Sequence, residues 1–206
     1  MALNSVNTNV GAMVALQNLQ KTNAELDITQ NRINTGKAVN SAKDNGAIWA
    51  IAQSQRSESA SLNAVKSSLQ RGQSTVDVAL SAGESISDLL TQMKTLALSA
   101  SDASLGTSAR ASLNEDFINL RNQITTVVAN ATFDGTNLIN AGTAGFKALA
   151  NAKGTSTINV AQQNLSLGGT IVTVAAAGAI ATASTAATMI TTVDTSIKNV
   201  STALSK

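Results

Sequence analysis

A stripe of apolar or small residues, spaced alternately by three and four positions, runs without interruption from Leu62 to Ala97. This spacing places the side chains on one face of an α-helix and is typical of a coiled-coil seam. At about 1.5 Å per residue the stripe is roughly 50 Å long, and we expect partner helices to bury it. The stripe, called the seam below, consists of Leu62, Val65, Leu69, Gly72, Val76, Ala79, Gly83, Ile86, Leu90, Met93 and Ala97.

The composition narrows the function classes. The 206 residues include no Pro, so long helices run without a proline kink. They also include no His and no Cys, which removes the commonest general base, the usual metal ligands and the thiol nucleophile. The sequence therefore predicts no enzyme, no catalytic residue, no metal site and no cofactor.

Charge and hydropathy argue against nucleic acids and membranes as partners. The net charge is only +2, the basic residues are scattered singly, and aromatic residues make up 2% of the chain. Residues 154–193 carry no charge, but Thr, Ser and Gly interrupt their apolar runs too often for a spanning helix. Residues 1–19 lack a charged leading segment and mix Asn and Gln with apolar residues, so no cleavable signal peptide is expected.

The apolar spacing predicts three helices in the first two thirds of the chain. The first ends near Gly36, which is expected to adopt the left-handed C′ conformation. The second starts in the mid forties and runs through the seam to about residue 100. The third returns antiparallel after a short loop, with Thr107 or Ser108 as its N-cap. Its seam positions are Leu113, Phe117, Leu120 and Ile124, and the stripe of the first helix is Leu3, Val6, Val10, Met13, Leu16 and Leu19.

Residues 138–181 differ in composition: Gly, Thr and Asn surround short runs in which apolar and polar residues alternate, such as 157–160 and 171–174. These runs predict strands in a small β-rich region. A last helical stripe follows, with seam positions at Ile190, Val193 and Ile197. The predicted fold is mainly α: a long antiparallel coiled-coil helical bundle with a small β-rich outer region.

Three motifs resemble bacterial flagellin, the subunit of the flagellar filament. They are MALNSVNTN at residues 1–9, the stretch from Arg32 to Ala47, and TFDGTNLI at residues 132–139. The second motif corresponds to the family's loop between its terminal and coiled-coil helices. Its positions here are Arg32, Asn34, Gly36, Asn40, Asp44 and Gly46.

The resemblance implies three parts: a filament-core helix and linker at 1–42, a coiled-coil domain at 43–137 plus 182–206, and a variable outer region at 138–181. Flagellins continue through a long C-terminal helix, of which only the first turns, from about Thr182, are expected here. The implied function is a secreted structural subunit that polymerises for swimming motility. Two alternatives remain open: a hook-filament junction protein, or a truncated flagellin that serves as a binding fragment.

The resemblance also implies partners. These are other flagellin subunits and the flagellar export apparatus, with an export chaperone as a further candidate, and export without a cleaved signal peptide. The family's innate immune-receptor patch matches only in part, at Leu96, Ala97 and Leu98, because Gln92 and Thr95 replace an Arg and a Glu. Weak recognition is therefore expected.

Overall fold

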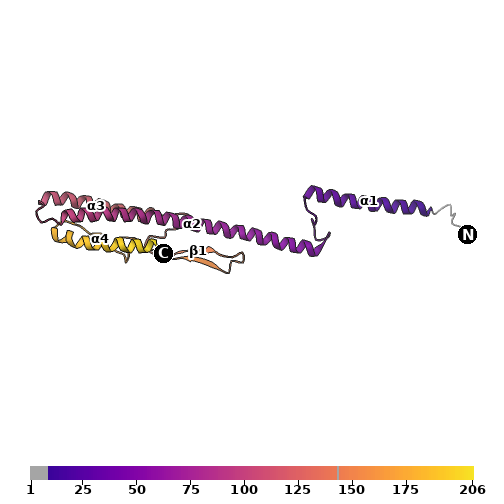
Figure 1. The fold of residues 1–206 in the computed structure, drawn as a ribbon. Helices are drawn as coiled ribbons and strands as arrows, with labels where there is room; N and C mark the ends of the chain where they lie inside the picture. The colour runs from indigo at the N-terminus through magenta and orange to yellow at the C-terminus, as the bar shows by residue number, and fades with distance from the viewer. Residues whose placement is uncertain (1–8, 143) are drawn as a thin grey trace. The chain divides into compact units, whose positions relative to one another are not determined.

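The computed structural model describes residues 9–142 and 144–206, which divide into two compact units, Met1–Ala60 and Ser61–Lys206. The described elements follow the order α1, α2, α3, β1, β2 and α4 (Figure 1). The long helix α2 (Gly46–Ala100) begins in the first unit and continues into the second. The predicted mainly α fold with a small β region is confirmed.

The first unit contains α1 (Val10–Thr35), a loop, and the start of α2. Asn9 caps α1 by accepting a hydrogen bond from the backbone N–H of Ala12 at 3.1 Å. Gly36 ends the helix with φ 65°, which confirms the predicted left-handed C′ glycine. Asn45 then caps α2, since its side-chain oxygen accepts a hydrogen bond from the Ile48 N–H at 3.1 Å.

The second unit packs α3 (Thr107–Asn130) and α4 (Ala183–Leu204) beside the later part of α2 (Figure 1). An ion pair joins Lys94 to Asp194, and Leu204 lies against Gly83, so α4 runs antiparallel to α2. The core between the three helices is apolar and fully buried. Its largest members from the helices are Ile86, Leu90, Met93, Phe117, Ile124, Val193 and Val200.

Arg110 holds the short connection between α2 and α3. Its Nε donates to the Ala100 carbonyl at 2.9 Å, and its Nη2 donates to the Asp102 carbonyl at 2.8 Å. The cation thus satisfies a carbonyl at the C-terminus of α2, where positive charge is favourable. The N-cap of α3 is Gly106, without a side-chain hydrogen bond, so the prediction of Thr107 or Ser108 as the cap is wrong.

A tight turn follows α3 at Asp134 and Gly135, which both have positive φ, 48° and 75°. Positive φ at both central positions is the signature of a type I′ turn. Asn137, which is buried, then joins this turn to the helix. Its Nδ2 donates to the Val128 carbonyl at 2.7 Å, and its Oδ1 accepts from the N–H of Ile139 at 2.9 Å.

The outer region contributes one antiparallel hairpin, made of β1 (Phe146–Leu149) and β2 (Thr157–Val160). The predicted strand at 157–160 is present. The predicted strand at 171–174 is wrong. Val172 and Val174 are buried there, but the Thr173 N–H donates to Ser196 Oγ of α4 at 3.0 Å, so the segment lies along a helix instead of pairing with a strand.

Candidate assembly surfaces

The later half of the seam forms the interior of the second unit. Ile86, Leu90 and Met93 have no exposed surface, because α3 and α4 cover this face of α2. Gly83 and Ala97 are buried as well, whereas Ala79 is half-buried. On the other helices Phe117, Ile124 and Val193 are fully buried, and the half-buried positions are Leu113, Leu120, Ile190 and Ile197.

The earlier half of the seam lies differently from the expected stripe. Leu62, Leu69 and Val76 are 52%, 38% and 37% exposed, and Leu80 extends their row. Val65 and Gly72 of the seam are buried here, and Ser68 and Thr75, which lie outside the predicted seam, are buried beside them.

The hairpin shifts the buried strip of α2 away from Leu62, Leu69 and Val76 and toward Ser68 and Thr75. The Leu149 N–H donates to Ser68 Oγ at 3.1 Å, and the Phe146 ring occupies the space beside Gly72. A Cβ at Gly72 would stand 2.5 Å from that ring, so only glycine admits the approach. Gly72, Ser68 and Thr75 are therefore buried together with Val65, while Leu62, Leu69 and Val76 remain on the surface. This outer row, Leu62, Leu69, Val76 and Leu80, is called the outer stripe below.

The outer stripe leads into an apolar groove of about 410 Å³ at the end of α4. Val76 and Leu80 of α2 line this groove together with Val160, Leu165 and Leu204. A groove with aliphatic walls that continues an exposed aliphatic row suits a further helix.

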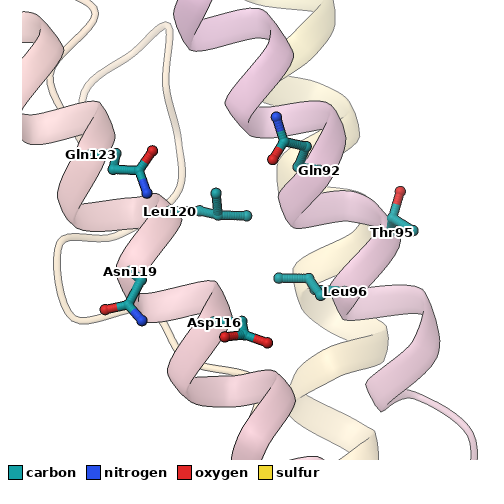
Figure 2. A pocket seen from close by; sticks show the side chains of 7 residues that line it. All are labelled: Gln92, Thr95, Leu96, Asp116, Asn119, Leu120 and Gln123. Atoms are coloured by element: carbon teal, nitrogen blue, oxygen red, sulfur yellow. The ribbon is translucent and has the colours of Figure 1, made fainter.

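A second groove, of about 480 Å³, opens between α2 and α3 (Figure 2). Leu96 and Leu120 point toward each other across it, and polar side chains surround them. The lining residues are Gln92, Thr95, Leu96, Asp116, Asn119, Leu120 and Gln123.

The residues of the expected immune-receptor patch do not share one surface. Leu96 lines the groove between α2 and α3, Ala97 is completely buried, and Leu98 is 60% exposed. Only Leu96 belongs to the groove, so these three neighbours do not form one contact face.

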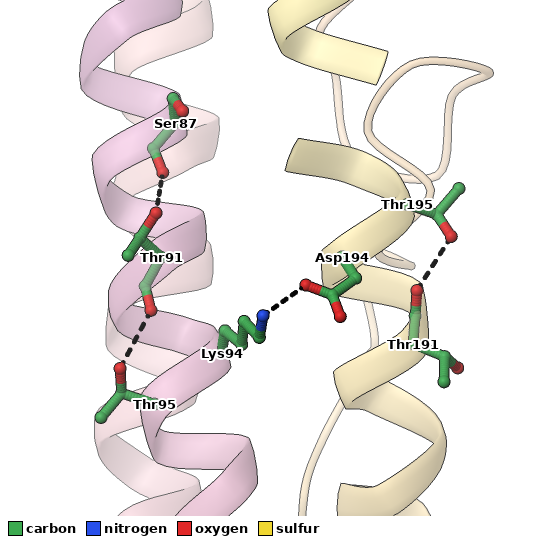
Figure 3. Close-up of polar contacts among 7 residues, drawn as sticks. All are labelled: Ser87, Thr91, Lys94, Thr95, Thr191, Asp194 and Thr195. Atoms are coloured by element: carbon green, nitrogen blue, oxygen red, sulfur yellow. Dashed lines mark hydrogen bonds and ion pairs between the residues drawn. The ribbon is translucent and has the colours of Figure 1, made fainter. Parts of the chain in front are cut away.

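The ion pair between α2 and α4 is accompanied by ladders of hydroxyl side chains (Figure 3). Lys94 Nζ lies 2.7 Å from Asp194 Oδ1, and both side chains are about 40% exposed, at 42% and 40%. Such a pair contributes up to about 1 kcal/mol. Thr91 Oγ1 donates to the Ser87 carbonyl one turn earlier, at 2.9 Å, and Thr195 does the same on α4.

In the first unit, α1 exposes those residues of its apolar stripe that the structure describes. Val10, Met13, Leu16 and Leu19 are between 56% and 64% exposed, and no residue of α1 is buried. Leu3 and Val6, assigned to the same stripe, lie outside the described residues. An amphipathic helix without a covered face is typical of a segment that packs on another chain or segment.

The loop motif after α1 is organised around one carboxylate. Asp44 Oδ2 accepts hydrogen bonds from the N–H groups of Asn40 and Ser41, at 3.0 and 3.1 Å. These two bonds lower the pKa of Asp44, because they favour its ionised form. Arg32 and Asn34 lie in the last turn of α1, and Gly46 is the first residue of α2.

The described residues include no group of three His, Cys, Asp or Glu side chains placed to hold a metal ion. Among the helices in the described part of the chain, none has the length and apolarity needed to cross a membrane. The surfaces that remain are apolar helix faces and grooves, which define a helical structural subunit that associates with other helices.

The comparisons with known proteins agree with this class. The profile of the family described as "Bacterial flagellin N-terminal helical region" matches residues 6–144. Flagellin FljM of Caulobacter vibrioides is 54% identical over 198 residues, which cover 96% of this chain and 71% of that protein. Flagellin C of Rhizobium meliloti is 33% identical over 169 residues, covering 82% of this chain and 50% of that protein.

A solved structure shows the same fold. Bacillus cereus flagellin superposes with a TM-score of 0.56 at 21% identity, covering 65% of this chain and 76% of that one. The chain belongs to the bacterial flagellin family. It is a structural subunit of the flagellar filament, the extracellular polymer of such subunits that serves motility.

Proposed function

We propose that the chain polymerises through the apolar helix faces that its own fold leaves uncovered. The observation that carries this proposal is the outer stripe of α2, which is exposed over its full length and leads into the groove beside α4. Burying a Leu or Val side chain completely contributes about 1.5–3 kcal/mol, so a helix laid along the stripe is strongly stabilised. We assign this surface to a neighbouring helix of the filament.

The first unit supplies the second polymerising face. α1 is amphipathic and has no buried residue, so its apolar stripe becomes covered only when the subunit joins the filament. In the free monomer we expect proteases to remove residues 1 to about 40 rapidly. Full protection of this segment in the monomer would contradict the assignment.

The three predicted parts correspond to these roles. Residues 1–42 form the filament-core helix and its linker, and residues 43–137 with 182–206 form the coiled-coil wall. Residues 138–181 form the outer region, whose hairpin packs on α2 through Phe146 and Leu149. The role is structural and not enzymatic, in keeping with a sequence that has no His and no Cys.

Delivery to the filament requires export. We assign the flagellar export apparatus as the route, without cleavage of a signal peptide, and an export chaperone as a further partner.

Seeded assembly tests the proposal. The chain is mixed with filament fragments, and electron microscopy and light scattering follow elongation, with size-exclusion chromatography to record the starting monomer. Leu69→Asp places a charge in the outer stripe and is expected to stop elongation without unfolding the chain. Ser67→Asp changes an exposed residue on another face of α2 and is the matched control. Failure of the unchanged chain to elongate, or normal elongation by Leu69→Asp, would refute the proposal.

A further inference from the structure

We infer that the hairpin of one copy inserts its outer edge into the groove between α2 and α3 of a second copy. This contact rests on the proposed function, because the partner is another subunit of the same filament. The inference specifies which two surfaces meet between one subunit and the next.

The groove offers an apolar floor inside a polar rim. Leu96 and Leu120 face each other across the floor, and the amides of Gln92, Asn119 and Gln123 stand around it (Figure 2). Each amide carries both a donor and an acceptor, so the rim suits a segment with free backbone N–H and C=O groups.

The hairpin provides such a segment. Among the described residues its sheet has two strands, and the Leu149 N–H of β1 donates to Ser68 Oγ of α2. In the described part of the chain the other edge of β2 has no neighbouring strand, and Thr157 and Ile158 of this strand are exposed, while Asn159 lines the groove at the end of α4. Ile158 is 51% exposed and is the apolar side chain that matches the Leu96 and Leu120 floor. An open strand edge with an exposed aliphatic side chain is a surface that pairs readily with another chain.

Charge complements the fit. The groove carries Asp116 on its rim, with Glu115 beside it and Asp88 one turn before Gln92 on α2. The hairpin carries Lys147 and Lys153, and residues 144–160 contain no acidic side chain. All five charged side chains are exposed, and within the described residues none of them makes an ion pair.

Geometry assigns the contact to two copies. Ser68, which holds the hairpin, and Leu96 of the groove lie 28 positions apart on one continuous helix, or about 42 Å at 1.5 Å per residue. The hairpin therefore cannot reach the groove of its own chain. Two different patches at opposite ends of the unit make a heterologous contact, which repeats in one direction and builds an open polymer.

Cysteine crosslinking tests the pairing directly, because the chain has no Cys. Thr157→Cys marks the strand edge and Thr95→Cys marks the groove, and both positions are exposed. An equimolar mixture of the two variants is treated with a short bis-maleimide linker and resolved by mass. We expect a several-fold excess of the heterodimer over its statistical share. A statistical product distribution would overturn the inference.

Charge swapping supplies the matched controls. In the Thr157→Cys chain, the hairpin charges are reversed by Lys147→Glu and Lys153→Glu, and we expect the heterodimer excess to disappear. When the groove charges of the Thr95→Cys chain are then reversed as well, by Glu115→Lys and Asp116→Lys, we expect the excess to return. Lys198→Glu on α4 should leave it unchanged. High salt should reduce the heterodimer excess of the original pair, since the screening length falls from about 10 Å at 0.1 M to about 3 Å at 1 M.

Two outcomes would overturn the inference here: an excess that persists after charge reversal, or a swapped pair that fails to restore it. Circular dichroism checks that every variant keeps its helical content. Seeded elongation tests the proposed function independently. Normal elongation combined with a statistical crosslink distribution would reject this contact alone.

Discussion

Leu90 and Leu69 belong to the same predicted seam, yet from the structure we expect their substitution by Ala to lower the free energy of unfolding by very different amounts. Leu90 is completely buried between α2, α3 and α4, whereas Leu69 is 38% exposed on the outer stripe. Leu90→Ala leaves a cavity in a closed core and should lower the free energy of unfolding by about 2–5 kcal/mol. Leu69→Ala leaves no closed cavity, and Ala is the better helix former, so we expect a loss below about 1 kcal/mol.

Urea denaturation followed by far-ultraviolet circular dichroism measures both changes. With a urea slope of about 1–3 kcal/mol per molar, Leu90→Ala should lower the midpoint by roughly 1 M or more, and Leu69→Ala by a few tenths. Trp49, the only Trp, lies in the first unit, so its fluorescence reports separately on that unit. Equal costs for the two substitutions, independent of protein concentration, would refute the assigned burial of the two faces of α2.

Three further predictions follow from individual contacts. Gly72→Ala should destabilise the hairpin by about 1–3 kcal/mol, because the new methyl overlaps the Phe146 ring; faster hydrogen exchange in β1 and β2 is the readout. Asn137→Ala should cost about 2–4 kcal/mol in thermal or urea unfolding, since buried backbone groups lose their partner, and a loss below 1 kcal/mol would contradict this. The Asp44 carboxyl should titrate below its usual pKa of 3.8 by NMR, and its stabilisation, present above that pH, should disappear as the pH falls through the lowered pKa.

The sequence was sufficient for the elements that carry a long local signal. The 3-4 spacing predicts α2, α3 and α4, because a helix buries one continuous face and the apolar residues repeat accordingly. Gly36 was predictable for a related reason: its left-handed conformation is a requirement of the helix end itself.

The burial of Ser68 and Thr75 in place of Leu69 and Val76 on α2 was not predictable from the local pattern. Leu62, Leu69 and Val76 fit the seam better than Ser68 and Thr75 on hydrophobicity alone. What selects the second face is a hairpin some 80 residues later, whose Phe146 ring needs the space at Gly72. A contact between residues so far apart in the sequence does not show in the spacing of apolar residues along the helix.

The missing strand at 171–174 has a similar origin. The alternation is real, since Val172 and Val174 face the core while Thr173 bonds to α4 through Ser196. Period-two burial therefore reports an extended chain with one covered face, whether the cover is a strand or a helix. The two grooves were missed because each is formed by segments distant in sequence.

The lateral surface of the helices has a property that bears on assembly. Ser and Thr side chains cover much of it, and many of their hydroxyls donate to carbonyls one turn earlier, as at Thr91, Thr126 and Thr202. These hydroxyl groups are polar enough to remain hydrated in a monomer, and because they are uncharged they cost less to desolvate than ionised groups when neighbours approach. The hydroxyl-rich stretches therefore favour close lateral packing of copies, and in the proposed contact the exposed charges of Lys147 and Asp116 help to set the register between subunits.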